Sequence, residues 1–416
     1  MIYTLHAPAT LSGEIALPPS KSISNRALII RALSQLPSSL ENLSNCDDTQ
    51  VMVRALTGKD IHKNVQASGT SMRFLTAYYS TLEGETILDG TERMRQRPIG
   101  PLVNALRECG AQIDFLGVEG FPPLRIKGRA LEGGCITMRG DISSQFVSAL
   151  LMIGPATKHG LSLKLKGKIT SQPYIDLTIQ MMRAFGAKVE RSEKFHSIRV
   201  FPGIYGQNNM EVENDWSAVS YWYELVTLMG GTQPTLHFDN FFEESIQGDA
   251  RLKDIFRHFG VKTMFKSHPF GHSLMGIEVR KKKPKLLKLD FSDIPDLAQT
   301  LVCTCLGTST RFHFSGLETL YIKETDRVAA LISEARKIGF VLTSPSYGEL
   351  KWDGQRCEPT HEPFDTHQDH RMAMAFAPLA VIVPGLRISN PEVVNKSYPD
   401  FWDHLRQVGF TIKETP

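Results

Sequence analysis

The chain has 416 residues, of which 41% are apolar and 22% are charged, a globular composition that excludes a disordered or low-complexity chain. At roughly 100 to 200 residues per domain, this length predicts about two to four domains. Lysines and arginines number 47 against 44 aspartates and glutamates, so the net charge is only +3 and no nucleic-acid partner is expected.

The sequence shows neither a predicted membrane span nor a secretory signal. Its longest uncharged stretches, residues 142–157 and 372–386, are shorter than the roughly 20 apolar residues that cross a bilayer. The opening residues MIYTLHAPAT lack the basic and apolar regions of a signal peptide. The six cysteines are scattered without a C-x-x-C pair, as in a reducing compartment. We therefore expect a cytoplasmic protein with no membrane partner.

Six amphipathic segments along the chain each end at a glycine. Their apolar residues recur at helical spacing, as Leu252, Ile255 and Phe259 do. The glycine just past each segment is expected to adopt the left-handed conformation that ends a helix. These glycines are Gly58, Gly110, Gly186, Gly260, Gly339 and Gly409. After a shorter first interval they recur about every 75 residues, which predicts an internal repeat.

A second helix with a small, polar start is predicted upstream of each glycine. The starts contain the marker residues Lys21, Gly69, Ser144, Ser217, Asp296 and His370, which follow the same period. Short alternating or β-branched runs such as LSLKLKG, TLHFDN and TRFHFSG predict strands between the helices. The chain therefore reads as an α/β protein of six repeats, each strand–helix–strand–helix–strand, with the first repeat shortened.

Cations lie at or beside these helix starts. They are Lys21, Arg26, Arg73, Arg97, Lys323, Arg327, Arg371 and Lys396. Taken singly, each is most simply a solvated surface group, and the polar residues beside them are most simply N-caps. Their recurrence at equivalent points of the repeat favours instead a strongly positive cleft, in which helix N-termini and fixed cations bind phosphates and carboxylates.

Two acids lie among these cations, Asp296 in DIPD and Glu324 in KETDR. Each can be a structural ion-pair partner, or a proton-transfer group beside a substrate hydroxyl. Five possible metal ligands lie within ten residues, namely His361, Asp365, His367, Asp369 and His370, and raise the alternative of a metal site. Their spacing fits no standard zinc pattern, so no metal is expected.

Nine motifs occur in order between about residue 14 and residue 409: PSKSISNRAL, SGTSMRFL, RMRQRPIGPL, DISSQFVSAL, SQPYIDLT, DIPDLA, KETDR, QDHRMAM and NKSYPDF. This series resembles the motifs of the 5-enolpyruvylshikimate-3-phosphate synthase family. The resemblance implies an α/β (α+β) enolpyruvyl transferase fold of two domains, each with three βαβαββ-type repeats. A lower domain would cover residues 20–212 and an upper domain would combine 1–19 with 213–416. A hinge near Pro18 and near Asn208–Asp215 would close around the substrates.

The resemblance also implies a reaction. The enolpyruvyl group of phosphoenolpyruvate would pass to the 5-hydroxyl of 3-phosphoshikimate through a tetrahedral intermediate, with release of phosphate. The hydroxyl must lose a proton while the enol methylene gains one, so one acid–base set must act in both directions. No cofactor is expected, and by the same likeness the protein would be a monomer.

Site residues are carried over from the family position by position. The residues that would contact 3-phosphoshikimate are Lys21, Ser22, Arg26, Ser143, Ser144, Gln145, Ser171, Tyr174, Asp296 and Lys323. Those that would contact phosphoenolpyruvate are Lys21, Gly69, Arg97, Gln145, Arg327, Arg371 and Lys396. The catalytic set would be Asp296 as the base on the hydroxyl, Glu324 with Lys21 in the remaining proton transfers, and His370 beside Arg371.

Four side chains depart from the usual family pattern. Ala67 and Thr319 stand where asparagine is common, Phe74 stands where proline is usual, and Trp216 occupies a usually small position. These departures put the affinity for phosphoenolpyruvate and the sensitivity to its mimics, such as glyphosate, in question. Two rival functions are a related transferase acting on UDP-N-acetylglucosamine and a catalytically silent anion-binding protein. The first would need a mobile-loop cysteine near Gly90–Arg97, which is absent, and the second has no need of a proton-transfer set.

Overall fold

The structure, a computed structural model, describes residues 1–34, 36, 38–141, 143–194, 196–230, 235–267, 273–280 and 282–415. The chain divides into two compact units, which are described separately. Residues 19–212 form the continuous unit, and residues 1–18 with 213–416 form the split unit. Among the described residues, no helix is both long and apolar enough to cross a membrane.

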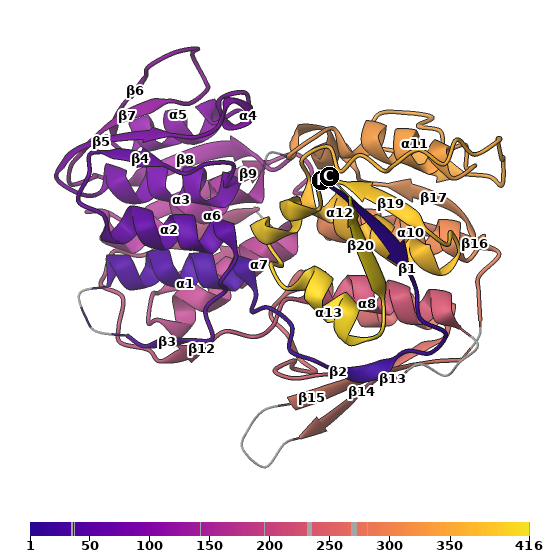
Figure 1. The fold of residues 1–416 in the computed structure, drawn as a ribbon. Coiled ribbons are helices and arrows are strands. Elements are labelled where there is room, and N and C mark those ends of the chain that lie inside the picture. The colour runs from indigo at the N-terminus through magenta and orange to yellow at the C-terminus, as the bar shows by residue number, and fades with distance from the viewer. Residues whose placement is uncertain are drawn as a thin grey trace. The chain divides into compact units, whose positions relative to one another are not determined.

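The second and third repeats of the continuous unit share one topology (Figure 1). The second comprises β4 (His62–Asn64), α3 (Gly69–Ser80), β5 (Gly84–Asp89), α4 (Glu92–Arg95), α5 (Gly100–Glu108), β6 (Gln112–Phe115) and β7 (Leu124–Gly128). The third comprises β8 (Gly134–Arg139), α6 (Ser144–Ile153), η1 (Gly154–Ala156), β9 (Leu161–Lys166), α7 (Gln172–Ala184), β10 (Val189–Ser192) and β11 (Ser197–Val200). In both sheets the first two strands are parallel and the last two add antiparallel, giving the orders β4-β5-β7-β6 and β8-β9-β11-β10.

The first repeat is the short one, as predicted. It comprises α1 (Lys21–Leu33), β3 (Leu40–Glu41) and α2 (Asp47–Thr57), and its sheet is a single parallel pair of β3 with β12 (Met210–Glu211). One expectation here is wrong. Gly58 after α2 has φ −71° and is extended, whereas the other five repeat glycines have φ between +84° and +100°. The chain leaves α2 in an extended conformation, and the Gly58 carbonyl accepts a hydrogen bond from Lys63 Nζ at 2.6 Å.

The split unit holds the other three repeats. The fourth comprises β2 (Ser12–Ile15), α8 (Trp216–Met229), β13 (Thr235–Phe238), η2 (Gly248–Arg251), α9 (Leu252–Phe256), η3 (Arg257–Phe259), β14 (Val261–Ser267) and β15 (Ser273–Val279). The fifth comprises β16 (Leu286–Asp290), η4 (Pro295–Leu297), α10 (Ala298–Gly307), β17 (Arg311–Ser315), η5 (Glu318–Ile322), α11 (Arg327–Lys337) and β18 (Leu350–Trp352). The sixth comprises α12 (His370–Phe376), η6 (Ala377–Val381), β19 (Leu386–Ser389), η7 (Pro391–Lys396), α13 (Phe401–Gln407), β20 (Thr411–Thr415) and β1 (Ile2–His6).

Two N-terminal strands complete sheets whose other strands come from the far end of the sequence. β2 adds parallel to β13, and β1 lies between β19 and β20, antiparallel to both. Both ends of the chain therefore lie in the same sheet of the split unit (Figure 1). With three repeats in each unit and the first repeat reduced, the predicted six-repeat α/β architecture is confirmed.

The predicted polar starts coincide with the beginnings of buried helices. Lys21, Gly69, Ser144 and His370 are the first residues of α1, α3, α6 and α12, Ser217 is the second of α8, and Asp296 lies in η4 immediately before α10. Helices such as α6 and α10 are apolar on nearly all sides and are almost wholly buried. Each of these core helices therefore begins with a polar first turn, and the candidate site is built from these first turns.

Candidate active site

In the continuous unit, Lys21 has an acidic neighbour that sequence reasoning missed. The side chain of Ser20 caps α1, and Lys21 follows with Nζ 3.2 Å from Asp48 Oδ2. Asp48 lies in the first turn of α2, where a carboxylate is also favoured by the helix dipole. Both side chains are largely buried, so the ammonium group is held at the helix start by a fixed counter-charge.

Arg26 lies inside the continuous unit, one turn after Ser22, whose carbonyl accepts from its guanidinium at 2.9 Å. Its Nε donates to Thr178 Oγ1 at 2.7 Å and its Nη2 donates to Ser148 Oγ at 3.2 Å, which ties α1 to α7 and α6. Burial lowers the pKa of Arg26 to about 10. The unusual Phe74 has a clear packing role here, because the Arg26 guanidinium lies 5.3 Å from its ring centre.

Hydroxyl and amide groups gather at the starts of α6 and α7. Ser143 caps α6 by accepting from the Gln145 backbone N–H at 3.3 Å, and Gln145 Nε2 reaches Thr70 Oγ1 at 3.2 Å. Ser171 precedes α7 in the left-handed conformation, with φ 54° and ψ 36°, and its carbonyl accepts from the Tyr174 N–H. Within the DISSQ motif, Ile142 lies outside the described residues. Ser143, Ser144 and Ser171 thus stand at two helix starts of one repeat.

Gly69 is a glycine because two guanidinium groups approach it. A Cβ atom at Gly69 would lie 2.8 Å from both Nη atoms of Arg97 and 3.0 Å from Nη1 of Arg73. Arg97 is 7% exposed, and within the described residues its buried Nε has no hydrogen-bond partner. A buried cation of this kind at a helix start is suited to an anionic ligand.

In the split unit, Asp296 contacts three cations. Its carboxylate lies 2.9 Å from Arg371 Nη2, 3.3 Å from Arg327 Nη1 and 3.6 Å from Lys323 Nζ. Arg371 also donates to the Tyr221 hydroxyl at 3.3 Å, so α8 helps to fix its position. The acid and the cations that the sequence placed at separate helix starts are brought together here.

Glu324 belongs to the same charged network. Its Oε1 lies 3.0 Å from Lys396 Nζ, and its Oε2 lies 3.1 Å from Arg327 Nη2. Arg327 also donates to Asp369 through Nε at 2.7 Å. Burial lowers the pKa of Arg327, but the carboxylates of Asp369, Glu324 and Asp296 more than offset this and raise it above its usual value. Asp369, one of the possible metal ligands in the sequence, is the N-cap of α12 and a partner of Arg327.

His370 is buried beside this network, with Nδ1 3.6 Å from Asp369 Oδ1. The neighbouring His367 pairs with Glu334 at 2.9 Å, and this hydrogen bond raises the pKa of His367. In the described part of the chain, no three histidine, cysteine or acidic side chains are grouped in a way that could hold a metal ion.

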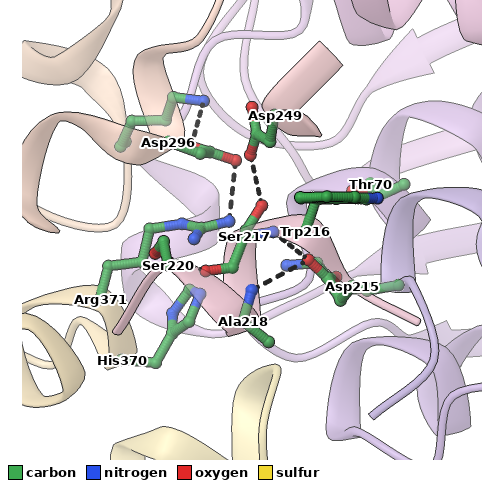
Figure 2. A network of polar contacts seen from close by, with 12 residues as sticks. Thr70, Asp215, Trp216, Ser217, Ala218, Ser220, Asp249, Asp296, His370 and Arg371 are labelled. Carbon is green, nitrogen blue, oxygen red and sulfur yellow. Dashed lines mark hydrogen bonds and ion pairs between the residues drawn. The ribbon is translucent and has the colours of Figure 1, made fainter. Parts of the chain in front are cut away.

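A second acid near Asp296 was also missed from the sequence. Ser217 Oγ donates to Asp249 Oδ2 at 2.5 Å, and Figure 2 shows Asp249 beside Asp296. The unusual Trp216 is explained by the same region, since its Nε1 donates to the buried carboxylate of Glu213 at 2.9 Å and its ring packs edge-on against Phe241. No sequence motif marks Asp249 or Glu213, and only the fold brings them to the start of α8.

Comparisons with known proteins agree on one family. A family model described as EPSP synthase (3-phosphoshikimate 1-carboxyvinyltransferase) matches residues 5–58 and 54–405. A 3-phosphoshikimate 1-carboxyvinyltransferase of Bacteroides fragilis is 50% identical over 416 residues, covering 99% of both chains. One from Vibrio cholerae is 33% identical over 97% of this chain and 99% of its own.

A solved EPSP synthase from Acinetobacter baumannii has a similar fold. Its TM-score is 0.76 at 19% identity, and the match covers 99% of this chain and 100% of that one. At this identity the structural likeness bears on the fold alone.

Proposed function

Because this chain belongs to the EPSP synthase family, we propose that the helix starts described above bind its two substrates and carry out the reaction between them. The activity is transfer of the enolpyruvyl group of phosphoenolpyruvate to 3-phosphoshikimate, in the shikimate pathway of aromatic amino-acid biosynthesis. The group is received by the 5-hydroxyl, and phosphate is released.

In this proposal the hydroxyl-rich starts of the continuous unit bind 3-phosphoshikimate. Ser143, Ser144 and Ser171 receive its phosphate, because backbone N–H groups and hydroxyls at helix starts favour phosphate oxygens. Gln145 and Tyr174 border this site. Lys21 and Ser22 add contacts at the start of α1, and Arg26 holds that start in place from inside through its bonds to α6 and α7.

Phosphoenolpyruvate is assigned to cations at the helix starts of both units. Arg97 over Gly69 is one binding group, supported by the buried Nε that lacks a partner in the described residues. Arg327, Arg371 and Lys396 of the split unit are assigned to the same substrate. Planar guanidinium groups suit its carboxylate and phosphate, which they can bind with two parallel hydrogen bonds.

The proton transfers fall to Asp296 and Glu324. Asp296 accepts the proton of the 5-hydroxyl as the C–O bond to phosphoenolpyruvate forms, with Lys323 beside it, and Glu324 with Lys21 supplies a proton to the methylene carbon. The tetrahedral intermediate then loses a proton from the new methyl group as phosphate departs. His370 is assigned to the site beside Arg371.

The contacts of Asp296 are the observation that carries this assignment. Three cations share one carboxylate at a helix start, and two of these cations, Arg327 and Arg371, are those assigned to an anionic substrate. When the substrate's carboxylate and phosphate take over the two guanidinium groups, their hold on Asp296 weakens. The carboxylate then becomes a stronger acceptor for the hydroxyl proton.

The test is phosphate release by the purified full chain. We expect release with phosphoenolpyruvate plus 3-phosphoshikimate, and none when UDP-N-acetylglucosamine replaces the shikimate. Release only with the nucleotide sugar would favour the related transferase. A folded chain that binds both substrates without turnover would indicate a silent family member.

Assembly and location complete the proposal. We infer a monomer, to be checked by light scattering after size-exclusion chromatography, and a hinge near Pro18 and Asn208–Asp215. A cytoplasmic location is supported by the free state of the described cysteines, since disulfides are rare in reducing compartments.

A further inference from the structure

The first residues of α8 are joined to the residues around η2 by a pair of hydrogen bonds. The Trp216 backbone N–H donates to Gln247 Oε1 at 3.2 Å, and the Ser217 hydroxyl donates to Asp249 Oδ2 at 2.5 Å. Gln247 is itself fixed by Glu213, whose Oε2 accepts from Gln247 Nε2 at 2.8 Å. The hydrogen bond from Ser217 fixes the carboxyl group of Asp249 in the core of the split unit, where this residue is 3% exposed.

Asp249 faces charged groups from three other elements. Asp296 comes from η4, Arg371 from the first turn of α12, and Asp215 from the N-cap of α8 (Figure 2). Arg371 Nη2 contacts Asp296 at 2.9 Å, so one cation acts on both carboxyl groups. Burial, followed by the charge of Asp296, raises the pKa of Asp249 to about 7, against the opposing effects of Ser217 and Arg371.

We propose that Asp249 is a positioning residue for the reaction: its carboxyl group, held by Ser217 beside Asp296, controls how strongly Asp296 accepts the hydroxyl proton. This inference rests on the proposed role of Asp296 as the base. Asp249 itself does not touch substrate in this proposal.

The effect follows from repulsion between like charges. When Asp249 is neutral, Asp296 is the only anion of the pair and its proton affinity is low. When Asp249 is ionised, the second negative charge makes Asp296 a stronger base. Rising pH through the range in which Asp249 titrates therefore increases the rate of hydroxyl deprotonation.

The main test compares kcat of wild type and Asp249→Asn from pH 6 to pH 8.5, with both substrates saturating. Asparagine keeps the shape and can still accept the Ser217 hydrogen bond, but it stays neutral. We expect a wild-type to variant ratio near 1 at pH 6 that rises to about 10 at pH 8.5, since one pKa unit corresponds to a factor of ten. Titration of the substrates' phosphates cancels in this ratio. A ratio that is constant with pH would overturn the proposal, because a residue needed only for folding lowers the rate equally at every pH.

A second variant keeps the carboxyl group and removes its hydrogen bond. Ser217→Ala takes away a donor that favours the ionised form of Asp249. The rise of kcat should move to higher pH, by up to about one unit. An unmoved profile would contradict the proposal, and this variant also decides the matter if Asp249→Asn does not fold.

The matched control is Asp254→Asn. Asp254 lies five residues further along, on α9, and its exposed side chain pairs with Arg257. The same chemical change there should give a ratio near 1 at every pH. Wild-type turnover is measured first: its absence would contradict the proposed function, whereas turnover with a constant ratio for Asp249→Asn would contradict only the present inference.

Discussion

The two units hold the arginines of their helix starts in different ways, although Lys21 of the continuous unit, like the cations of the split unit, pairs with an acid, Asp48. In the continuous unit, Arg26 and Arg97 have no acidic partner among the described residues. Arg26 donates to hydroxyls and carbonyls, and the Arg97 guanidinium lies against Gly69. In the split unit, Arg327 and Arg371 contact carboxylates directly, and Lys323 and Lys396 join the same network.

This difference refines the expectation of a strongly positive cleft. Within the described residues Arg97 has no acidic partner, and an anionic ligand could supply one, which is why the proposal assigns Arg97 to binding. In the split unit the cations already pair with carboxylates, so in the proposed mechanism an entering anion exchanges with a carboxylate. In that proposal the exchange couples substrate binding to the proton affinity of Asp296.

The comparison between the two units predicts that Arg327→Met has the largest effect, a loss of stability. Removing this buried cation leaves Asp369 and Glu324 without their shared partner, which should lower the free energy of unfolding by about 3–5 kcal/mol. Urea denaturation measures it. Arg336→Met, an exposed change on the same helix, should stay within about 0.5 kcal/mol of wild type. Equal losses in both variants would mean that the ion-pair network is not what stabilises this region.

Asp296→Asn tests the proton-transfer half of the comparison. The variant keeps the size of the side chain but removes the proposed base, so kcat should fall by roughly 100-fold or more. Steady-state phosphate release measures this. The control is Asp293→Asn, three residues earlier, where the side chain is exposed and pairs with Arg251. A wild-type rate in Asp296→Asn would show that another group is the base.

Arg97→Met tests the binding half. Because Arg97 has no acidic partner within the described residues, its loss should not lower stability, whereas the KM for phosphoenolpyruvate should rise by about 10-fold or more. The control is Arg95→Met, which breaks an exposed ion pair with Asp89 and should change neither the stability nor the KM appreciably. A large loss of stability with an unchanged KM would reverse the roles given to the two units.

Gly69→Ala should have the smallest effect. The new methyl group would lie 2.8 Å from the Arg97 guanidinium, which is too close, so the guanidinium must shift. The shift costs little because the guanidinium is the end of a flexible side chain. We expect a KM for phosphoenolpyruvate raised about two- to five-fold, less than in Arg97→Met, with kcat changed less. Gly203→Ala, where the added atom meets open space, is the control. A Gly69→Ala variant with unchanged KM would place the phosphoenolpyruvate contact elsewhere.

The sequence predicted the parts of this molecule that repeat. The polar start of a helix and the glycine after its end are local sequence signals. Because they recur in six copies, they could be recognised even in the short first repeat. Gly58 was the exception, because the path of the chain after α2 is set by the next strand rather than by the helix.

Partners across the fold could not be predicted. Asp48, Asp249 and Asp369 act on residues that lie far along the chain or in another element, and no local pattern marks such pairs. Trp216 departs from the usual family pattern, yet its indole N–H donates to Glu213, a buried carboxylate that no sequence pattern marks. The pairing of β1 with β19 and β20 joins segments nearly the whole chain apart, and periodicity carries no information about it.

The place of β1 and β2 sets the order in which this chain can fold during synthesis. All residues of the continuous unit, 19–212, have been made once residue 212 has left the ribosome. The sheet of β19, β1 and β20 needs residue 415, so the first strand made must wait for the last. Until β19 and then β20 have been made, the backbone edges of β1 that pair with them stay unpaired. The nascent chain can therefore carry a complete continuous unit while its first strand still has unpaired edges, at which another chain or a chaperone can bind.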